Sequence, residues 1–166
     1  MASTKRIMDV INTQIEISDT KNSISKRNLR DDIIFNNVSF SYNEKSSIFN
    51  KLSFQIKRDN LIGIVGQTGT GKTTLIKLLL RLYNIENGEI TIGSDNINDI
   101  SLKSLRQNIA LVSQETFLFD GTIKDNISYP NLNLSLDKIR AASKLSQCDE
   151  FIDKLPDEYN TTIGER

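Results

Sequence analysis

The sequence predicts an α/β fold built around a phosphate-binding loop, and three consecutive segments carry that prediction. Residues 61–65 (LIGIV) form a short, almost continuous apolar run, which is typical of a strand buried on both faces of a parallel sheet. The glycine-rich stretch GQTGTGKT occupies 66–73, directly after this run. Residues 72–83 (KTTLIKLLLRLY) then place apolar side chains at helical spacing, with Lys77 and Arg81 four apart on another face.

The residues ahead of this core predict a helix end, a linker and two strands. Residues 2–11 have a weak helical period, and 12–32 is a polar, charged segment whose Lys, Arg and Asp side chains we expect to form a solvated face. Apolar residues over 33–42 combine a short run with period-two alternation, which predicts a strand. Alternation of Leu52, Phe54 and Ile56 predicts a second one.

Behind the core, the sequence predicts two strands and a short helix. A short strand is expected over 89–92, closed by Gly93, and a short helix over 102–108. Residues 109–112 (IALV) are again an apolar run of the buried-strand type.

The last third of the chain is predicted to be helical. Thr122, followed three residues later by Asp125, is typical of an N-cap box that opens a short helix ending at Ile127. Longer helical segments follow over 138–145 and 149–155.

The composition excludes several chemical classes. The chain of 166 residues has no His and one Cys, so Ser-His-Asp triads, His-based acid–base catalysis and Cys/His zinc sites are excluded. Lys plus Arg number 21 and Asp plus Glu number 21, and this balance argues against a nucleic-acid partner. No apolar stretch approaches the ~18 residues of a membrane-spanning helix.

Residues 66–73 match the phosphate-loop pattern G-x-x-x-x-G-K-[ST] in full. Glycines permit backbone torsions and close approach that point consecutive N–H groups at phosphate oxygens, and the following helix adds its positive end. We expect Lys72 to reach the β- and γ-phosphates and the hydroxyl of Thr73 to bind Mg²⁺. A Gly/Thr-rich turn ahead of a helix is the alternative interpretation. No N-K-x-D segment for reading guanine is present, and a small phosphate-loop kinase remains a third possibility.

With Tyr42 ahead of the loop and LVSQETFLFDGTIKDNI at 111–127 behind it, the chain resembles the nucleotide-binding domain of an exporter-type ABC transporter. The resemblance extends over nearly the whole chain. It implies that Tyr42 stacks on adenine and that Gln114 contacts Mg²⁺ and senses the transmembrane domains. The expected ATP-binding residues are Tyr42, Gly66, Gln67, Thr68, Gly69, Thr70, Gly71, Lys72, Thr73, Thr74 and Gln114, with Thr73 and Gln114 also at the Mg²⁺ ion.

The resemblance also implies the organisation of the chain. Residues 1–32 would be the end of a membrane-helix extension with its linker, and 33–166 a partial nucleotide-binding domain. Within it, 33–112 would hold a small antiparallel β subdomain and the phosphate-loop core, and 113–166 the start of a helical subdomain. The implied partners are a second nucleotide-binding domain, in a head-to-tail dimer, and transmembrane domains. The implied location is the cytoplasmic side of a membrane.

The resemblance ends at Arg166, ahead of the place where the family has its LSGGQ signature, Mg²⁺-binding Asp, catalytic Glu and switch His. Lys72 and Gln114 would therefore assist, and no catalytic residue is present. We expect the chain to bind ATP better than it hydrolyses it, either as part of a transport ATPase or, alternatively, as a non-catalytic ATP-binding fragment or interaction module. Asp59 and Glu158 stand where exporters often have Gly, which strains both turns if they need positive φ.

Overall fold

The computed structural model describes residues 7–8, 11–12, 15–43, 46–114, 116–129, 131 and 133–164. The described chain forms two compact units that divide between Leu111 and Val112. Residues 7, 8 and 11 are helical, and Asn12 follows in a turn. The other residues of the helix predicted over 2–11 lie outside the described residues.

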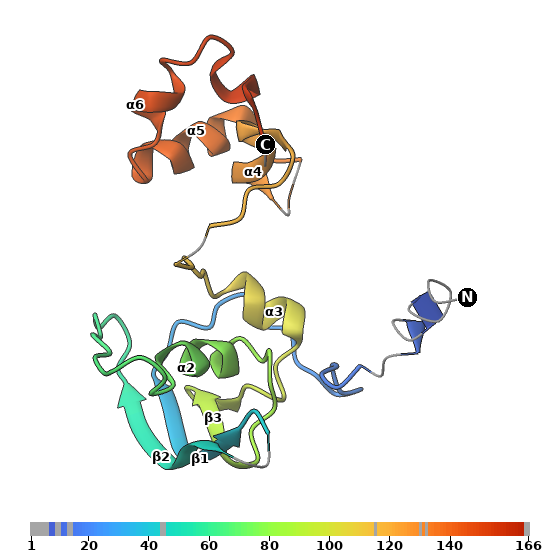
Figure 1. Ribbon diagram of the computed structural model, residues 1–166, viewed down its shortest axis with the longest axis vertical. Helices are drawn as coiled ribbons and strands as arrows, with labels where there is room; N and C mark the ends of the chain where they lie inside the picture. Colours follow the sequence, from blue (N-terminus) through green and yellow to red (C-terminus); the bar gives the residue numbers. More distant parts are fainter. Residues whose placement is uncertain are drawn as a thin grey trace. The chain divides into compact units, whose positions relative to one another are not determined.

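The first unit is built on an antiparallel sheet (Figure 1). Its four strands are β1 (Ile33–Ser41), β2 (Ser47–Ile56), β3 (Asn87–Ile92) and β4 (Asp95–Asn96), in the order β2-β1-β3-β4. Phe35 of β1 lies opposite Phe54 on one side and Ile90 on the other, and the two Phe rings stack at 4.6 Å. The predicted strands over 33–42 and 52–56 are confirmed, although β2 already begins at Ser47.

Helices α2 (Lys72–Leu79) and α3 (Leu102–Gln107) contribute to the core of this unit (Figure 1). The hydroxyl of Ser101 caps α3 by accepting a hydrogen bond from the Ser104 N–H. The buried apolar core joins sheet and helices and consists of Phe35, Val38, Phe40, Phe49, Leu78, Ile90, Ile92, Ile97, Ile100 and Leu105. The sheet and this core therefore fix the position of α2, the helix that follows the glycine-rich loop.

Helix α2 ends at Leu79 and not at Tyr83 as the periodicity predicted. The N–H of Arg81 donates to the Leu78 carbonyl and the N–H of Leu82 to the Lys77 carbonyl, which is a Schellman ending. Arg81 adopts φ 48° there, a left-handed conformation that usually belongs to glycine. The helical period holds only as far as this turn, so the predicted surface position of Arg81 is wrong.

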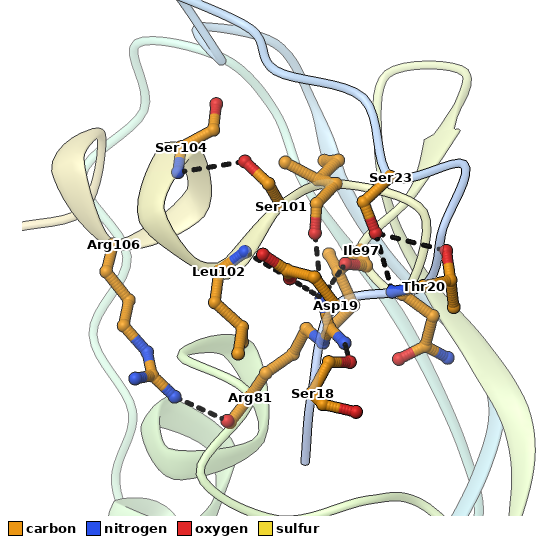
Figure 2. Close-up of polar contacts among 12 residues, drawn as sticks. Ser18, Asp19, Thr20, Ser23, Arg81, Ile97, Ser101, Leu102, Ser104 and Arg106 are labelled. Carbon is orange, nitrogen blue, oxygen red and sulfur yellow. Dashed lines mark hydrogen bonds and ion pairs between the residues drawn. The ribbon is translucent and has the colours of Figure 1, made fainter.

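Arg81 is buried, with 5% of the residue exposed, and ties three segments together (Figure 2). One guanidinium nitrogen, Nη1, donates to the carbonyls of Ile97 at 3.2 Å and Ile100 at 2.7 Å. The other, Nη2, donates to the Ser18 carbonyl at 3.4 Å, and the Asp19 carboxylate lies 3.9 Å from Nη1. Burial lowers the pKa of Arg81, and the charge of Asp19 opposes that change.

The charged segment 15–32 is mostly exposed, as expected, but specific bonds also hold it to the core. The Ile24 N–H donates to the Asp99 carbonyl, and the Ser101 N–H donates to the Ile24 carbonyl. The Asp19 carboxylate accepts a hydrogen bond of 2.7 Å from the Leu102 N–H at the start of α3 (Figure 2). The predicted solvated face thus also has backbone hydrogen bonds and one carboxylate contact that attach the segment to the core.

The predictions of strands over 61–65 and 109–112 are also wrong. Neither segment is paired with a strand among the described residues, and Leu61, Val65 and Val112 are 100%, 94% and 91% exposed. An apolar run reports what the side chains prefer, but a strand also needs a neighbouring backbone to accept and donate hydrogen bonds. The first run lies beside a cavity of about 540 Å³ whose walls include Leu52, Phe54 and other apolar residues.

The second unit consists of short helices closed by a two-stranded ribbon. The ribbon pairs β5 (Gly121–Thr122) with β6 (Thr162–Ile163). The remaining elements are α4 (Ile123–Ser128), α5 (Leu136–Leu145), α6 (Asp149–Ile152) and the 3₁₀ turn η1 (Glu158–Asn160). Their core contains Ile123, Ile139, Ile152 and Tyr159. The predicted helical character of this part is confirmed.

The predicted N-cap of α4 is confirmed in atomic detail. The hydroxyl of Thr122 accepts a hydrogen bond from the Asp125 N–H, and the Asp125 carboxylate accepts one from the Thr122 N–H. The Thr122 hydroxyl and backbone N–H both hold the pKa of the Asp125 carboxyl below its ordinary value. The capping box therefore stabilises α4 when the Asp125 carboxyl is charged.

Two turns carry the strain that the sequence pointed to. Asp59 has φ 61° and Glu158 has φ 44°, both in the left-handed region that glycine adopts without cost. Asp59 accepts hydrogen bonds from the Arg30 guanidinium, which lower the pKa of its carboxyl. Glu158 is paired with Arg140 at 3.0 Å on the surface.

Candidate nucleotide-binding site

The loop over 66–73 has a backbone that only glycine accommodates at two of its positions. Gly69 and Gly71 have φ of 87° and 92°. A Cβ built on Gly71 would also lie 2.7 Å from the Phe49 ring and 2.8 Å from Ile48, so a side chain there would collide with β2. Gly71 of the sequence pattern, together with Gly69, thus belongs to a turn that brings the loop close against the sheet and into the start of α2.

The start of α2 is open to an anion. Gly71 is the N-cap residue and provides no side chain to cap the helix. The first turn contains no acidic residue. The N–H groups of the first turn of a helix have no partner within it, and they carry the positive end of the helix dipole. A phosphate group at this position would find backbone donors without a competing carboxylate.

Lys72 lies across the loop. Its ammonium donates to the carbonyls of Gly66 and Gln67, each at 2.7 Å. Thr70 closes the same turn, because its hydroxyl donates to the Gln67 carbonyl at 2.9 Å. An ammonium has three N–H donors, so these two contacts fix its position at the loop and leave one donor for a further acceptor.

The other predicted residues of the first unit lie around this turn. Gln67, Thr68 and Thr73 are exposed, whereas Thr74 is buried. Tyr42, just past the end of β1, is 43% exposed, and its hydroxyl lies 3.1 Å from that of Thr74. The structure thus places the hydroxyl of Tyr42 beside the first turn of α2, the helix that follows the phosphate loop.

Gln114 belongs to the second unit. It is exposed and lies at a bend ahead of β5. Its predicted contacts to Mg²⁺ and to a transmembrane partner therefore stay predictions.

A Mg²⁺ ion fits the donors of this loop. Mg²⁺ prefers hard oxygen ligands and is usually held by substrate phosphates, waters and one or two protein groups. The exposed Thr73 hydroxyl on the first turn of α2 is such a group. Among the described residues there is no cluster of three or more Asp, Glu, Cys or His that could hold a metal ion. A Mg²⁺ ion here would thus arrive with the phosphates that it neutralises.

Comparison with known proteins decides the family. Residues 49–165 match the family described as ABC transporter. The chain belongs to the ABC transporter family. A solved structure, a bacterial Atm1-family ABC exporter with ATP bound, superposes with a TM-score of 0.90 at 34% sequence identity, covering 99% of this chain and 29% of that one. The ABC ATPase fold and the resemblance to exporter nucleotide-binding domains are thereby confirmed.

Curated relatives show the same membership. An uncharacterized ABC transporter ATP-binding protein of Bacillus subtilis, YknU, is 40% identical over 99% of this chain. The ATP-dependent lipid A-core flippase of Legionella pneumophila is 40% identical over 86% of this chain. The chain spans 28% and 24% of the lengths of these two relatives. No described helix of this ABC transporter domain is both long enough and apolar enough to cross a bilayer.

No direct signal in the sequence indicates two features next to the site. Arg81 ends α2 with its guanidinium inside the protein, although its spacing from Lys77 placed it on a polar face. Tyr83 and Lys77 lie against Tyr42, a contact between residues 35 to 41 positions apart that no local pattern reveals. The presence of Tyr42 and Tyr83 in the sequence is the only signal that could have suggested this pair of rings.

Proposed function

We propose that this chain is the ATP-binding part of an ABC exporter and binds Mg·ATP at the N-terminus of α2. The observation that carries the proposal is the loop itself, with Gly69 and Gly71 in left-handed conformations and Lys72 held at its mouth. Backbone N–H groups and the helix dipole would bind the phosphates, and Lys72 would neutralise charge on the β- and γ-phosphates.

Three further residues complete the proposed nucleotide site. Thr73 would place its hydroxyl on Mg²⁺, whose chemistry is to bridge and neutralise phosphate oxygens. The ring of Tyr42 would stack on adenine, because an aromatic face and a purine offer matching flat apolar surfaces. Gln114 would contribute an amide oxygen from the second unit.

In the complete transporter, we propose that a second nucleotide-binding domain pairs head to tail with this one. Binding and hydrolysis of ATP would then drive transmembrane domains that carry substrate across the membrane, with this chain at the cytoplasmic side. Support comes from the exporter whose structure superposes with this chain and from the flippase relative. Phosphoryl transfer depends on positioning and charge stabilisation, so both ATP sites would need groups from the partner domain.

Calorimetric titration of the whole chain with Mg·ATP tests the proposed binding. Lys72→Ala should weaken binding by at least about tenfold, since a hydrogen bond to a charged group contributes ~1.5–3 kcal/mol. Lys57→Ala is the matched control, because Lys57 is exposed at the end of β2. Equal affinities for the wild-type chain and Lys72→Ala would refute the proposal.

A further inference from the structure

The ring of Tyr42 is enclosed by two aromatic neighbours and one cation. The Tyr83 ring meets it edge to face, with centroids 5.0 Å apart and an interplanar angle of 86°. The Phe40 ring packs in the same manner at 4.9 Å. The Lys77 ammonium lies 5.6 Å from the centroid of the Tyr42 ring and 5.8 Å from that of Tyr83. Tyr42 thus has a defined place although it is nearly half exposed.

The chain folds so that these residues meet. Lys77 lies on α2 one turn beyond Thr74, whose hydroxyl contacts that of Tyr42. The left-handed turn at Arg81 reverses the chain, and Tyr83 follows it. The Leu82 N–H is bonded to the Lys77 carbonyl, which keeps Tyr83 beside the Lys77 side chain. The end of α2 therefore determines where Lys77 and Tyr83 lie relative to Tyr42.

An exposed Tyr that adopts many rotamers loses conformational entropy when a ligand orders it, whereas a ring already held in place loses little. Perpendicular aromatic contacts and a cation over the ring face both favour one orientation. The Lys72 ammonium, in contrast, is held by the carbonyls of Gly66 and Gln67, and neither bond involves Tyr42. The contribution of the nucleobase to affinity should therefore depend on Tyr83 and Lys77, while the contribution of the phosphates should not.

We propose that Tyr83 and Lys77 are positioning residues that fix the ring of Tyr42 for the base of a nucleotide, and so set how much the base adds to affinity. This inference rests on the proposed function, because it requires a nucleotide at the loop. Neither residue needs to touch the nucleotide. Their effect passes through Tyr42.

The test compares Mg·ATP with Mg·tripolyphosphate, which carries the phosphates without a base. Both probes are titrated calorimetrically into the full chain and its variants. Tyr83→Leu and Lys77→Met should each weaken ATP binding by about fivefold, the equivalent of about 1 kcal/mol for one aromatic or cation–π contact. Tripolyphosphate binding should stay within about twofold of the wild type, as should ATP binding by Tyr83→Phe, which keeps the ring.

Two matched controls and one double variant separate positioning from damage. Tyr129→Leu and Lys57→Met, at exposed positions elsewhere, should leave both affinities within about twofold. In a Tyr42→Ala background, Tyr83→Leu should have no further effect on ATP binding, because the residue through which it acts is gone.

Each contrary result has a distinct meaning. An unchanged ATP affinity in Tyr83→Leu and Lys77→Met, or an equal loss for ATP and tripolyphosphate, overturns the positioning role while the proposed function stands. An undiminished effect of Tyr83→Leu in the Tyr42→Ala background overturns it as well. A wild-type chain that binds neither probe overturns the proposed function, and the inference falls with it.

Discussion

Replacing the buried Arg81 tests how the helix behind the phosphate loop is held. Arg81→Met keeps the aliphatic volume and the left-handed turn but removes the guanidinium. The carbonyls of Ile97 and Ile100 then lose their donors at 3.2 and 2.7 Å, and the Ser18 carbonyl loses a weaker one at 3.4 Å. Leaving a buried acceptor without a partner costs ~1–3 kcal/mol, and the absence of a buried charge offsets part of this loss. We expect a net destabilisation of about 3 kcal/mol.

A second variant at the same position separates the side chain from the backbone. Arg81→Gly also removes the guanidinium, but glycine adopts φ near 48° without the ~1–2 kcal/mol that an L-residue loses in a left-handed conformation. Arg81→Gly should therefore be less destabilised by about 1 kcal/mol than Arg81→Ala, which removes the same guanidinium and aliphatic stem but keeps an L-residue in the left-handed turn. Arg58→Met is the control, because Arg58 is exposed and its pair with Asp59 is a surface ion pair worth ~0–1 kcal/mol.

Urea denaturation gives the free energies of unfolding, and amide hydrogen exchange shows where the protein opens. The N–H groups of Ile24 and Ser101, which join the N-terminal segment to the loop before α3, should exchange about 100-fold faster in Arg81→Met. A loss of less than about 1 kcal/mol in Arg81→Met, with exchange of these two amides unchanged, would refute this view of Arg81.

Two more predictions concern the second unit. Glu158→Gly should stabilise it by about 1 kcal/mol in urea denaturation, because relief of the left-handed φ of 44° outweighs the exposed pair with Arg140, and a destabilised variant would contradict this. The second prediction follows from the lowered pKa of the Asp125 carboxyl. The charged carboxylate stabilises the fold at pH values above the pKa that Asp125 has in the unfolded chain, and this contribution is lost as the pH falls below about 4. Asp125→Asn should remove this part of the acid dependence, measured by circular dichroism against pH, and an identical acid profile would contradict it.

Local signals in the sequence predicted local structure correctly. The capping box of Thr122 and Asp125 needs only residues three apart, so its pattern was sufficient. The glycine-rich loop likewise specifies its own turn, and Gly69 and the pattern glycine Gly71 have positive φ values, which favour glycine. Tyr42 was expected near the loop through resemblance alone, and the bond to Thr74 places it there.

Local sequence patterns could not predict the features that depend on residues distant in the chain. The apolar run 61–65 has the side chains of a buried strand, but strand formation requires a paired backbone that the described residues do not provide. Arg81 has the spacing of a surface residue, and only the turn after Leu80 carries it inward. The pairing of Ile24 with Ile100 joins segments that no periodicity connects.

The most direct test of nucleotide binding at the start of α2 is to follow the backbone amides of the ¹⁵N-labelled chain by NMR during titration with Mg·ATP. Phosphate oxygens bonded to N–H groups should shift the amide signals of residues 66–74 most strongly, and Lys72→Ala should reduce these shifts at equal ligand concentration. Saturable shifts confined to other residues, with 66–74 unchanged, would contradict the proposed site.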